Sequence, residues 1–319
     1  MKISAVIPAY NSAKFIAAAI ASIQAQSLAV DEIIVVDDGS TDNTEEVVAN
    51  IAGSISYIKQ TNQGPSSARN KGIELATGDW IAFLDADDQW TPEKISKQIK
   101  TLKNHPELRL IAGDMAEIDI DDKIITASVL AKHNLLKNFQ QLAGSPIPDA
   151  LAALVSKNFI PTGTVLVDRN AIVAAGLFST EIRYGEDLEM WAKIAAKHPI
   201  ACLPEILMLR RQHGANATQA SERMLVDLIK VTDSIRRYAK NQLEALSVSP
   251  DGLVADAHWM LGYWHFTNSN RRKAFSSFAS SLKQQFRLNT FVYLLSCWLP
   301  EPIKGVARFI KQKFVKFFY

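Results

Sequence analysis

The sequence predicts an α/β protein with a doubly wound, mostly parallel sheet, followed by a helical extension. Two observations carry this prediction. Short apolar runs alternate with helical patterns through the first hundred residues, and strands that alternate with helices form parallel sheets covered on both faces. From about residue 220 onward the pattern is helical throughout. We therefore expect one domain over residues 1–219 and a helical region over residues 220–319.

Four apolar runs predict buried strands, and the segments between them predict helices. The strands are expected at 3–7, 32–37, 55–59 and 80–85, and the helices at 11–26, 41–52 and 64–78, with Asn11, Asp42 and Ser66 as N-caps. After residue 105 the pattern predicts a hairpin from 108–119 and 122–129, a strand, turn and short helix over 162–176, a helix over 184–198 and a strand over 206–218 that leaves into a polar loop.

Composition narrows the class of protein. A chain of 319 residues, 48% of them hydrophobic, can bury a large core as one large domain or two smaller ones. Its formal charge of +2 lacks the strong basic field of a nucleic-acid binder, so nucleic acid is not an expected partner. Only Cys202 and Cys297 occur, without disulfide or zinc spacing, which favours a cytoplasmic location. No signal peptide or membrane-spanning segment is expected.

Polar residues gather where three of the predicted strands end. They are the segments 8–11, 37–40 and 85–88, the last with acids at Asp85, Asp87 and Asp88. In parallel sheets ligands bind outside the carboxyl ends of the strands, so these segments should share one edge. A single D-x-D is most often a solvated turn. Several such clusters on one edge favour a diphosphate ligand held through a divalent cation, for which oxygen ligands suit Mg²⁺ or Mn²⁺.

Four stretches, in order, resemble the family 2 glycosyltransferases of the GT-A fold, of the non-processive type that builds bacterial cell-surface polysaccharides. They are "AVIPAYNSAKFIAAAIASIQAQ", "DEIIVVDDGSTDNT", "NQGPSSARNKGIELATGDWIAFLDADD" and "YGEDLEMW". The resemblance covers roughly residues 1–213 and is specific for the family. It implies an inverting hexosyltransferase that moves one sugar from a nucleotide-diphosphate sugar, typically a UDP-sugar, to a hydroxyl of a glycan or lipid-linked acceptor.

The resemblance also implies which residues bind the nucleotide. They are Pro8, Ala9, Tyr10, Asn11, Asp38, Gly39, Arg69, Asp85 and Ala86. The first four would border the base, Asp38 would hydrogen-bond it, and Arg69 would lie at the nucleotide side of the site. Asp85 would face the ribose.

The metal and the catalytic base are implied in the same way. Asp87 would hold the Mn²⁺ or Mg²⁺ ion that bridges the diphosphate, and Asp187 would be the base. An R-x-H segment, Arg211 to His213, can add a metal or phosphate contact, although Arg210 stands where the family usually has an aromatic residue. Two plainer interpretations stay open. His213 can be an ordinary loop histidine, and Asp187 can be an acid that stabilises a helix N-terminus.

Mechanism and alternatives follow from the same residues. A carboxylate that takes the acceptor proton opposite the leaving group gives displacement with inversion. The Q-x-x-R-W motif of processive synthases is missing, which favours transfer of single sugars. A non-catalytic sugar-nucleotide-binding or assembly subunit remains an alternative. A nucleotidyltransferase is a weaker one, because the first turn, "PAYNSAKF", lacks a Gly-rich basic loop.

The C-terminal region carries two further patterns. Residues 261–282 resemble a single tetratricopeptide-type helical hairpin, which we interpret as a packing extension whose aromatic residues form core. In residues 303–317, apolar positions share one helical face and basic residues lie largely outside it. Such a helix can rest peripherally on the anionic inner face of the cytoplasmic membrane, or it can pack on the domain. Membrane contact would suit a lipid-linked acceptor.

Overall fold

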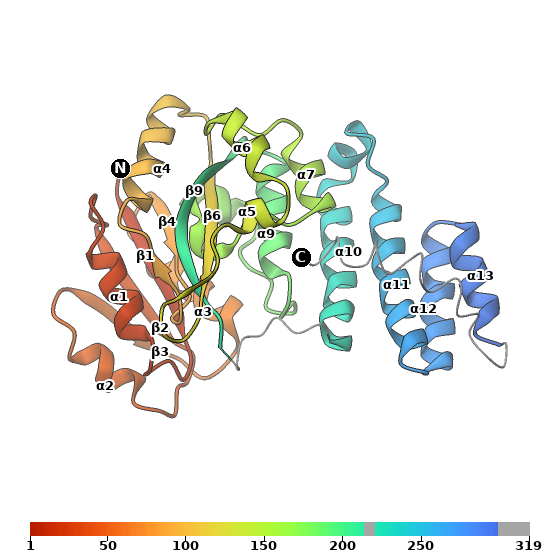
Figure 1. Ribbon diagram of the computed structural model, residues 1–319, viewed down its shortest axis with the longest axis horizontal. Helices are drawn as coiled ribbons and strands as arrows, with labels where there is room; N and C mark the ends of the chain where they lie inside the picture. The colour runs from red at the N-terminus through yellow and green to blue at the C-terminus, as the bar shows by residue number, and fades with distance from the viewer. Residues whose placement is uncertain (214–220, 299–319) are drawn as a thin grey trace. The chain divides into compact units, whose positions relative to one another are not determined.

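The computed structural model describes residues 1–213 and 221–298, which belong to two compact units (Figure 1). The first unit comprises Met1–Ala150, Phe159–Arg183 and Lys197–Ala217, and the second comprises Leu151–Asn158, Tyr184–Ala196 and Thr218–Tyr319. The predicted boundary after residue 219 falls outside the described residues. The second unit also includes two segments that precede this boundary.

The first unit is built on one sheet. Its strands follow the order β3-β2-β1-β4-β8-β6-β9-β5, with β7 beside β6. The strands β1 to β4 pair in parallel, as do β6 and β9, whereas β5, β7 and β8 run antiparallel to their neighbours. The bounds are β1 (Ile3–Ala9), β2 (Glu32–Asp37), β3 (Ile55–Lys59), β4 (Trp80–Phe83), β5 (Gln89–Trp90), β6 (Leu110–Ile118), β7 (Ile124–Thr126), β8 (Leu166–Asp168) and β9 (Ile200–Arg211).

Helices cover both faces of this sheet, which confirms the predicted fold class. Ile3, Ala5 and Ile7 of β1 form one core with apolar residues of α1, α2 and α4. On the opposite face α3 lies so close to β1 that a Cβ on Gly72 would come within 2.3 Å of Val6 Cγ1, so only glycine fits there. The helices are α1 (Ile16–Gln24), α2 (Thr44–Ala49), α3 (Pro65–Leu75), α4 (Lys94–Asn104), α5 (Val129–Lys132), α6 (Leu136–Leu142), η1 (Thr162–Thr164) and α8 (Arg169–Ala174).

The start of α3 differs from the prediction. Ser66 was expected to be the N-cap, but the helix begins at Pro65 and Gly64 occupies the N-cap with a φ of 90°. Proline suits the first helical position because its φ is already helical and its missing N–H has no partner there. At α2 the expected N-cap, Asp42, lies one position too early, because Asn43 is the N-cap and makes no capping hydrogen bond with its side chain. Asp42 still contacts the helix start, since its Oδ1 accepts a hydrogen bond from the Thr44 N–H at 3.1 Å.

The second unit is helical in its described part. Its helices are α7 (Ala150–Ser156), α9 (Glu186–Ala195), α10 (Glu222–Ala245), α11 (Pro250–Thr267), α12 (Arg271–Gln284) and α13 (Leu288–Ser296). The predicted hairpin over 261–282 is confirmed as α11 and α12, which approach closely because Gly262 faces Phe278. Trp259 stacks on Tyr263 at 5.3 Å between ring centroids and contacts Tyr293 edge-on, so these aromatic residues do form core.

The predicted amphipathic segment 303–317 lies outside the described residues. Among the helices that the structure does describe, none combines the length and apolar character required to cross a bilayer.

Candidate active site

The candidate site lies at the edge where the parallel strands of the first unit end. β1 pairs with β2 on one side and β4 on the other, so the strand order turns back between β1 and β4. Ligands bind outside the strand ends at such a switch point. The segments after β2 and β4 are tied to β1, because the Asp38 N–H donates to Ala9 O at 2.8 Å and the Leu84 N–H to Val6 O at 3.1 Å. The three predicted polar segments therefore follow neighbouring strands at one edge.

The loop after β1 presents an aromatic ring at this edge. Pro8 and Ala9 end the strand, and Tyr10 follows with 52% of its surface exposed. A planar base can stack on such a ring. Asn11 is wrongly predicted as an N-cap. It has a left-handed φ of 48°, and its Oδ1 accepts a hydrogen bond from the Thr41 N–H at 2.8 Å. This loop geometry delays the start of α1.

Asp37, the last residue of β2, is a structural acid. It is buried, and it accepts hydrogen bonds from the Ser40 N–H at 2.7 Å and from the Tyr57 hydroxyl. Burial and this hydrogen bond raise the pKa of Tyr57, so the phenol keeps the proton that it donates. Gly39 follows with a φ of 81°, and a Cβ there would lie 2.9 Å from the Asn62 nitrogen. The turn therefore requires glycine.

Asp38 fixes the loop that leads into α3. Its two oxygens accept hydrogen bonds from the Gln60 side chain at 2.7 Å, the Gln63 N–H at 2.9 Å and the Gly64 N–H at 2.7 Å. A carboxylate offers about four lone-pair positions, which leaves one for another donor such as the N–H of a bound base. The residue is otherwise buried. Its position is compatible with the predicted base contact and adds a structural role.

Arg69 of α3 is the partner of the first acid in the D-x-D segment. Its Nη2 donates to Asp85 Oδ1 at 2.8 Å, and its guanidinium carbon lies 5.6 Å from the centroid of the Phe178 ring. The Arg69 side chain is buried, whereas the Asp85 carboxylate is partly exposed. Ala86, between the acids, packs into the core. Ala86 thus anchors the D-x-D segment in the core, and Arg69 compensates the charge of the partly exposed Asp85 carboxylate.

Asp87 and His213 are brought together from distant parts of the first unit's sequence. His213 Nε2 lies 2.8 Å from Asp87 Oδ2. The imidazole stacks on Phe15, with ring centroids 5.2 Å apart and an interplanar angle of 23°. Both side chains are partly buried. His213 is thus held beside the acid that the sequence assigned to the metal.

Sequence reasoning assigned no role to Asp88, which connects these two segments. Its Oδ1 accepts a hydrogen bond from the Arg211 N–H at 2.9 Å, two residues before His213. Burial, followed by repulsion from Asp87 and Asp85, raises the pKa of the Asp88 carboxyl well above its usual range. The only sequence signal was the unusual third acid in "DADD".

The Arg211 side chain completes this connection. Its guanidinium donates from Nε to Asp87 O at 3.3 Å, from Nη1 to Asp119 O at 3.0 Å and from Nη2 to Asp122 Oδ1 at 2.7 Å. The sequence suggested a metal or phosphate contact for this segment. The arginine is buried among protein acceptors, and it joins the end of β9 to the acidic turn and to the β6–β7 connection.

Asp187 lies in the second unit, in the first turn of α9. Gly185 is the N-cap with a φ of 83°, and Asp187 Oδ1 accepts a hydrogen bond from the Leu188 N–H at 2.6 Å. The same turn contains Glu186 and Glu189. Acids in a first turn favour the helix because they oppose its dipole. This position fits the helix-terminal interpretation.

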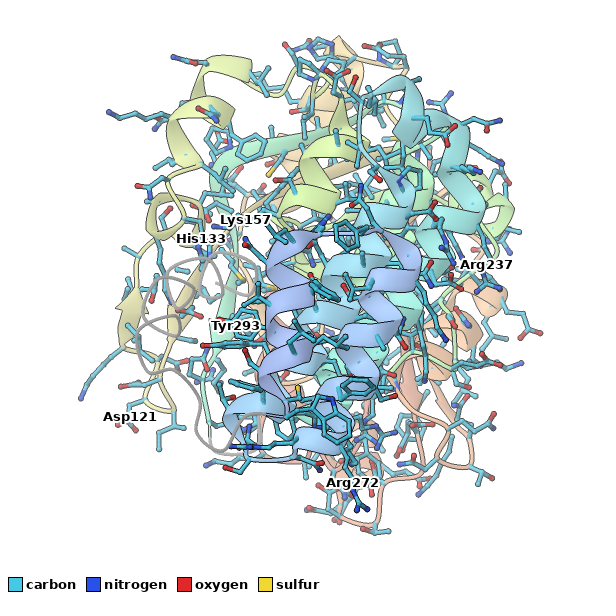
Figure 2. The ribbon with its side chains drawn as sticks, turned by 90° about the vertical axis from the view of Figure 1, so that its right-hand side faces the viewer. Asp121, His133, Lys157, Arg237, Arg272 and Tyr293 are labelled. Atoms are coloured by element: carbon cyan, nitrogen blue, oxygen red, sulfur yellow. The ribbon has the colours of Figure 1, made fainter. Side chains whose placement is uncertain are left out.

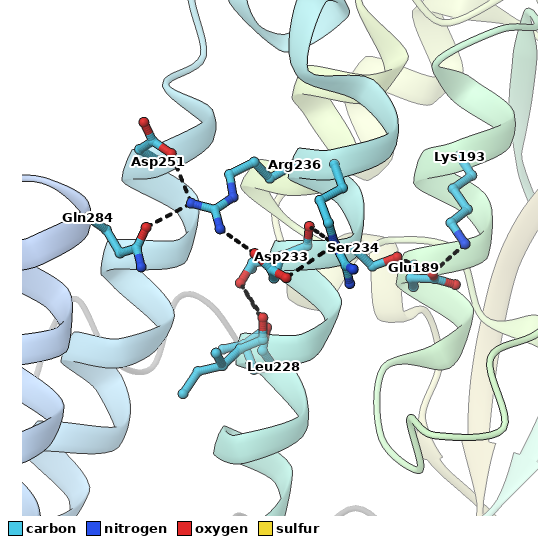
Figure 3. Close-up of polar contacts among 11 residues, drawn as sticks. Glu189, Lys193, Leu228, Asp233, Ser234, Arg236, Asp251 and Gln284 are labelled. Carbon is cyan, nitrogen blue, oxygen red and sulfur yellow. Dashed lines mark hydrogen bonds and ion pairs between the residues drawn. The ribbon is translucent and has the colours of Figure 1, made fainter.

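A polar network joins α9 to α10 (Figure 3). Glu189 is buried, and its Oε1 accepts from Lys193 Nζ and from Ser234 Oγ, each at 2.5 Å. Further along α10, Arg236 Nη1 donates to Asp251 of α11 at 2.9 Å. A buried carboxylate with two partners resists displacement, because losing Lys193 would leave its charge unpaired and losing Ser234 would remove a hydrogen bond. The network therefore holds the helix that carries Asp187 in one orientation on α10.

The donors at Asp87 and His213 fit a divalent cation. One is a carboxylate oxygen and the other an imidazole nitrogen, a mixed pair that suits Mn²⁺ better than Mg²⁺. Asp85 is engaged by Arg69. Within residues 1–213 and 221–298, no three His, Cys, Asp or Glu side chains are grouped so that they could hold a metal ion. A cation held by this pair would need further ligands from the molecule that it binds.

The arrangement of the sheet and its covering helices is the GT-A fold. Structures of Staphylococcus aureus TarS residues 1–349, solved with UDP and with UDP-GlcNAc, each match with a TM-score of 0.66 over 99% of this chain and 88% of theirs, at 16% and 17% identity. Residues 4–142 match the family model "Glycosyl transferase family 2".

Two curated relatives extend the match. An uncharacterised glycosyltransferase of Rickettsia typhi is 31% identical over 257 residues, which cover 80% of this chain and 78% of the relative. One of Rickettsia conorii is 31% identical over 237 residues, or 73% of this chain, but this match spans only 37% of the longer relative. The chain belongs to glycosyl transferase family 2.

Proposed function

We propose that this chain is an inverting, metal-dependent glycosyltransferase that moves one sugar from a UDP-sugar to a hydroxyl of a glycan or lipid-linked acceptor. Membership of family 2 supports the reaction class. The TarS structures contain UDP and UDP-GlcNAc, which supports a uridine nucleotide as donor. The observation that carries the proposal is the pairing of Asp87 with His213 at the switch point of the sheet.

Each proposed role rests on the position of a side chain. Tyr10 offers an exposed ring for the base, and Asp38 retains one lone-pair position for a base N–H. Asp85 faces the ribose, with Arg69 compensating its charge at 2.8 Å. This compensation lets Asp85 accept hydrogen bonds from hydroxyl groups without adding net repulsion toward a diphosphate.

Asp87 and His213 would hold the cation, which when bound would offset the negative charge of the departing diphosphate. Asp187 would accept the proton of the acceptor hydroxyl as that oxygen attacks, since a hydroxyl is a weak nucleophile until a base takes its proton. A single base opposite the leaving group implies inversion at the transferred sugar.

The decisive experiment compares Asp187→Asn with Glu186→Gln. UDP-sugars are first screened for Mn²⁺-dependent thermal stabilisation, which should reach about 2.7 kcal/mol for a ligand at about 100 times its Kd. With the selected donor and acceptor, Asp187→Asn should lower the transfer rate by roughly 10² to 10⁴ while UDP–Mn²⁺ affinity persists. Glu186→Gln is the matched control and should stay within about tenfold.

Other outcomes would decide against parts of the proposal. Donor binding without transfer by the wild-type chain, for every acceptor tested, would favour a non-catalytic sugar-nucleotide-binding subunit. Near-normal transfer by a folded Asp187→Asn variant would remove Asp187 as the base. Stabilisation by UDP-sugars that is the same with and without Mn²⁺ would contradict metal dependence.

A further inference from the structure

The charge of the chain is distributed unevenly along its length. Residues 257–319 contain ten basic residues and a single acid, Glu301, a formal charge of +9. Because the whole chain carries +2, the preceding 256 residues carry −7. No Asp or Glu occurs from residue 257 to 300. Such a block of one sign points to an anionic partner rather than to a need of the fold.

The same region presents an apolar strip on α13. On this helix and just beyond its two ends, six large apolar side chains are between 38% and 77% exposed: Phe286, Leu288, Phe291, Val292, Leu295 and Trp298. Four of them, Leu288, Phe291, Leu295 and Trp298, recur at spacings of three or four residues, so they share one side of the helix. Single exposed apolar residues are common, but a contiguous strip indicates an interaction surface.

The strip is not an unpacked core. The opposite side of α13 already packs inside the unit, where Tyr293 and Cys297 are buried against Phe278 of α12. Trp298 touches Phe275 with ring centroids 5.6 Å apart, which places the end of the strip beside the first turns of α12. Figure 2 looks onto these helices, with Arg272 at the start of α12.

Basic side chains lie near both ends of the strip. Arg271 and Arg272 begin α12, one turn before Phe275, and Arg287 directly precedes α13. Arg287 is paired with Asp256, the last acid before residue 301. At the start of α12, Lys273 is paired with Glu222. The surface therefore combines an apolar centre, aromatic rings and cationic groups, the combination found in membrane-surface helices.

We propose that the exposed side of α13, with the basic start of α12, is a docking surface for an anionic lipid bilayer. The apolar strip would enter the boundary between headgroups and acyl chains, and the arginines would contact lipid phosphates. This surface is separate from residues 303–317, for which membrane contact was expected from sequence. It goes beyond the proposed transfer reaction and does not depend on it.

Charge decides among the occupants of the strip. The chain's own last residues, 302–319, contain five basic side chains and no acid, so folding them over this basic surface would bring like charges together. A second copy of the chain docked through the same basic surface would also bring like charges together. An anionic bilayer offers both an apolar interior and opposite charge. The bilayer is therefore the occupant that the observations favour.

The test uses the full chain and sedimentation with vesicles of phosphatidylcholine, alone or mixed with phosphatidylglycerol. The double variant Leu288→Ser/Leu295→Ser should lose at least about tenfold in partitioning onto the anionic vesicles, because two anchoring side chains are removed. Leu28→Ser/Val173→Ser is the matched control, since both residues are exposed and apolar in the first unit. Partitioning of this control onto the anionic vesicles should stay within about twofold of the wild-type value. Arg272→Gln should lower partitioning onto the anionic vesicles by up to about fivefold, and high salt should remove the difference between this variant and the wild-type chain.

A conservative variant keeps the test independent of folding. Trp298→Phe preserves bulk, and brominated acyl chains should quench less tryptophan fluorescence in it than in the wild-type chain. Light scattering of the free proteins reports association of copies. Unchanged pelleting together with a loss of dimer in the double variant would assign the strip to a second copy. If the double variant pelleted as much as the wild-type chain or more, and light scattering showed no change in its mass, the chain's own end would be the segment that covers the strip. Either result would overturn the proposal.

Discussion

Replacing Arg211 with lysine tests whether the buried guanidinium organises the acidic turn. The substitution keeps the positive charge but replaces three donating nitrogens with one. In the structure those nitrogens reach Asp87 O, Asp119 O and Asp122 Oδ1. A lysine can retain one of these hydrogen bonds. We therefore expect both a loss of folding stability and weaker metal-dependent binding of UDP at the acidic turn.

The expected loss of stability can be worked out from the interactions that the substitution would remove. A hydrogen bond from a charged donor contributes about 1.5–3 kcal/mol, and one of the two bonds that lysine cannot replace is long. The guanidinium also lies 5.4 Å from the centroid of the Phe15 ring, an interaction that contributes about 0.5–1 kcal/mol. The total is about 2–4 kcal/mol, or roughly 4–16 °C in Tm for a domain of this size.

Thermal unfolding by circular dichroism and calorimetric titration with UDP and Mn²⁺ would measure the two effects. Groups that orient metal ligands typically contribute 10- to 100-fold in metal affinity, so metal-dependent UDP binding should weaken in that range. Arg210→Lys is the control. Its guanidinium lies 3.9 Å from Glu117 in a partly exposed ion pair, and it should change stability by about 1 kcal/mol or less. Equal losses of stability in the two variants, or weakened binding with unchanged stability, would refute the reasoning. The second result would instead favour a direct contact between Arg211 and the diphosphate.

Two further predictions concern the first unit. Asp87→Ala should abolish the Mn²⁺-dependent part of UDP binding. The loss of Tm should be small, because the Asp87 carboxylate is partly exposed at the sheet edge. If calorimetry gave an unchanged Mn²⁺ dependence of UDP binding, Asp87 would be excluded as a metal ligand. Lys94 is buried against Trp90, and burial lowers its pKa well below the usual value. Because the unfolded chain then binds more protons, Lys94 makes the free energy of unfolding rise with pH up to about 10.4. Lys94→Met should flatten that rise in urea titrations between about pH 7 and 10, and an unaltered slope would show that Lys94 stays charged when folded.

The sequence predicted the sheet and its functional edge because both depend on local patterns. Strands buried on two faces are continuous apolar runs, and parallel strands end at a common edge. The order of the motifs therefore placed Pro8, Asp38 and Asp85 at one edge of the sheet. The start of α1 was missed for a different reason. Asn11 resembles an N-cap locally, but its side chain bonds to Thr41, 30 positions away.

The contacts that organise the site could not be predicted in this way, because they join residues far apart in sequence. Asp88 and Arg211 are separated by 123 positions. Glu189 meets Ser234 across 45 positions. Periodicity and capping rules act over a few residues, so they give no information about such pairs. The exposed strip on α13 was equally hidden, since an apolar helix face has the same spacing whether it is buried or exposed.

The acidic turn itself shows how the long-range contacts change the chemistry. Three carboxylates in four positions repel one another, and the sequence alone required a cation or another compensating group for them. Each acid instead has its own partner: Asp85 has Arg69, Asp87 has His213, and Asp88 has the Arg211 N–H. Of these partners only an imidazole is itself a metal ligand, and its contact with Asp87 can be exchanged for contacts with an ion. These partners reduce the repulsion without removing it, since Asp87 and Asp85 still raise the pKa of Asp88, and ion binding need rearrange only the Asp87–His213 pair.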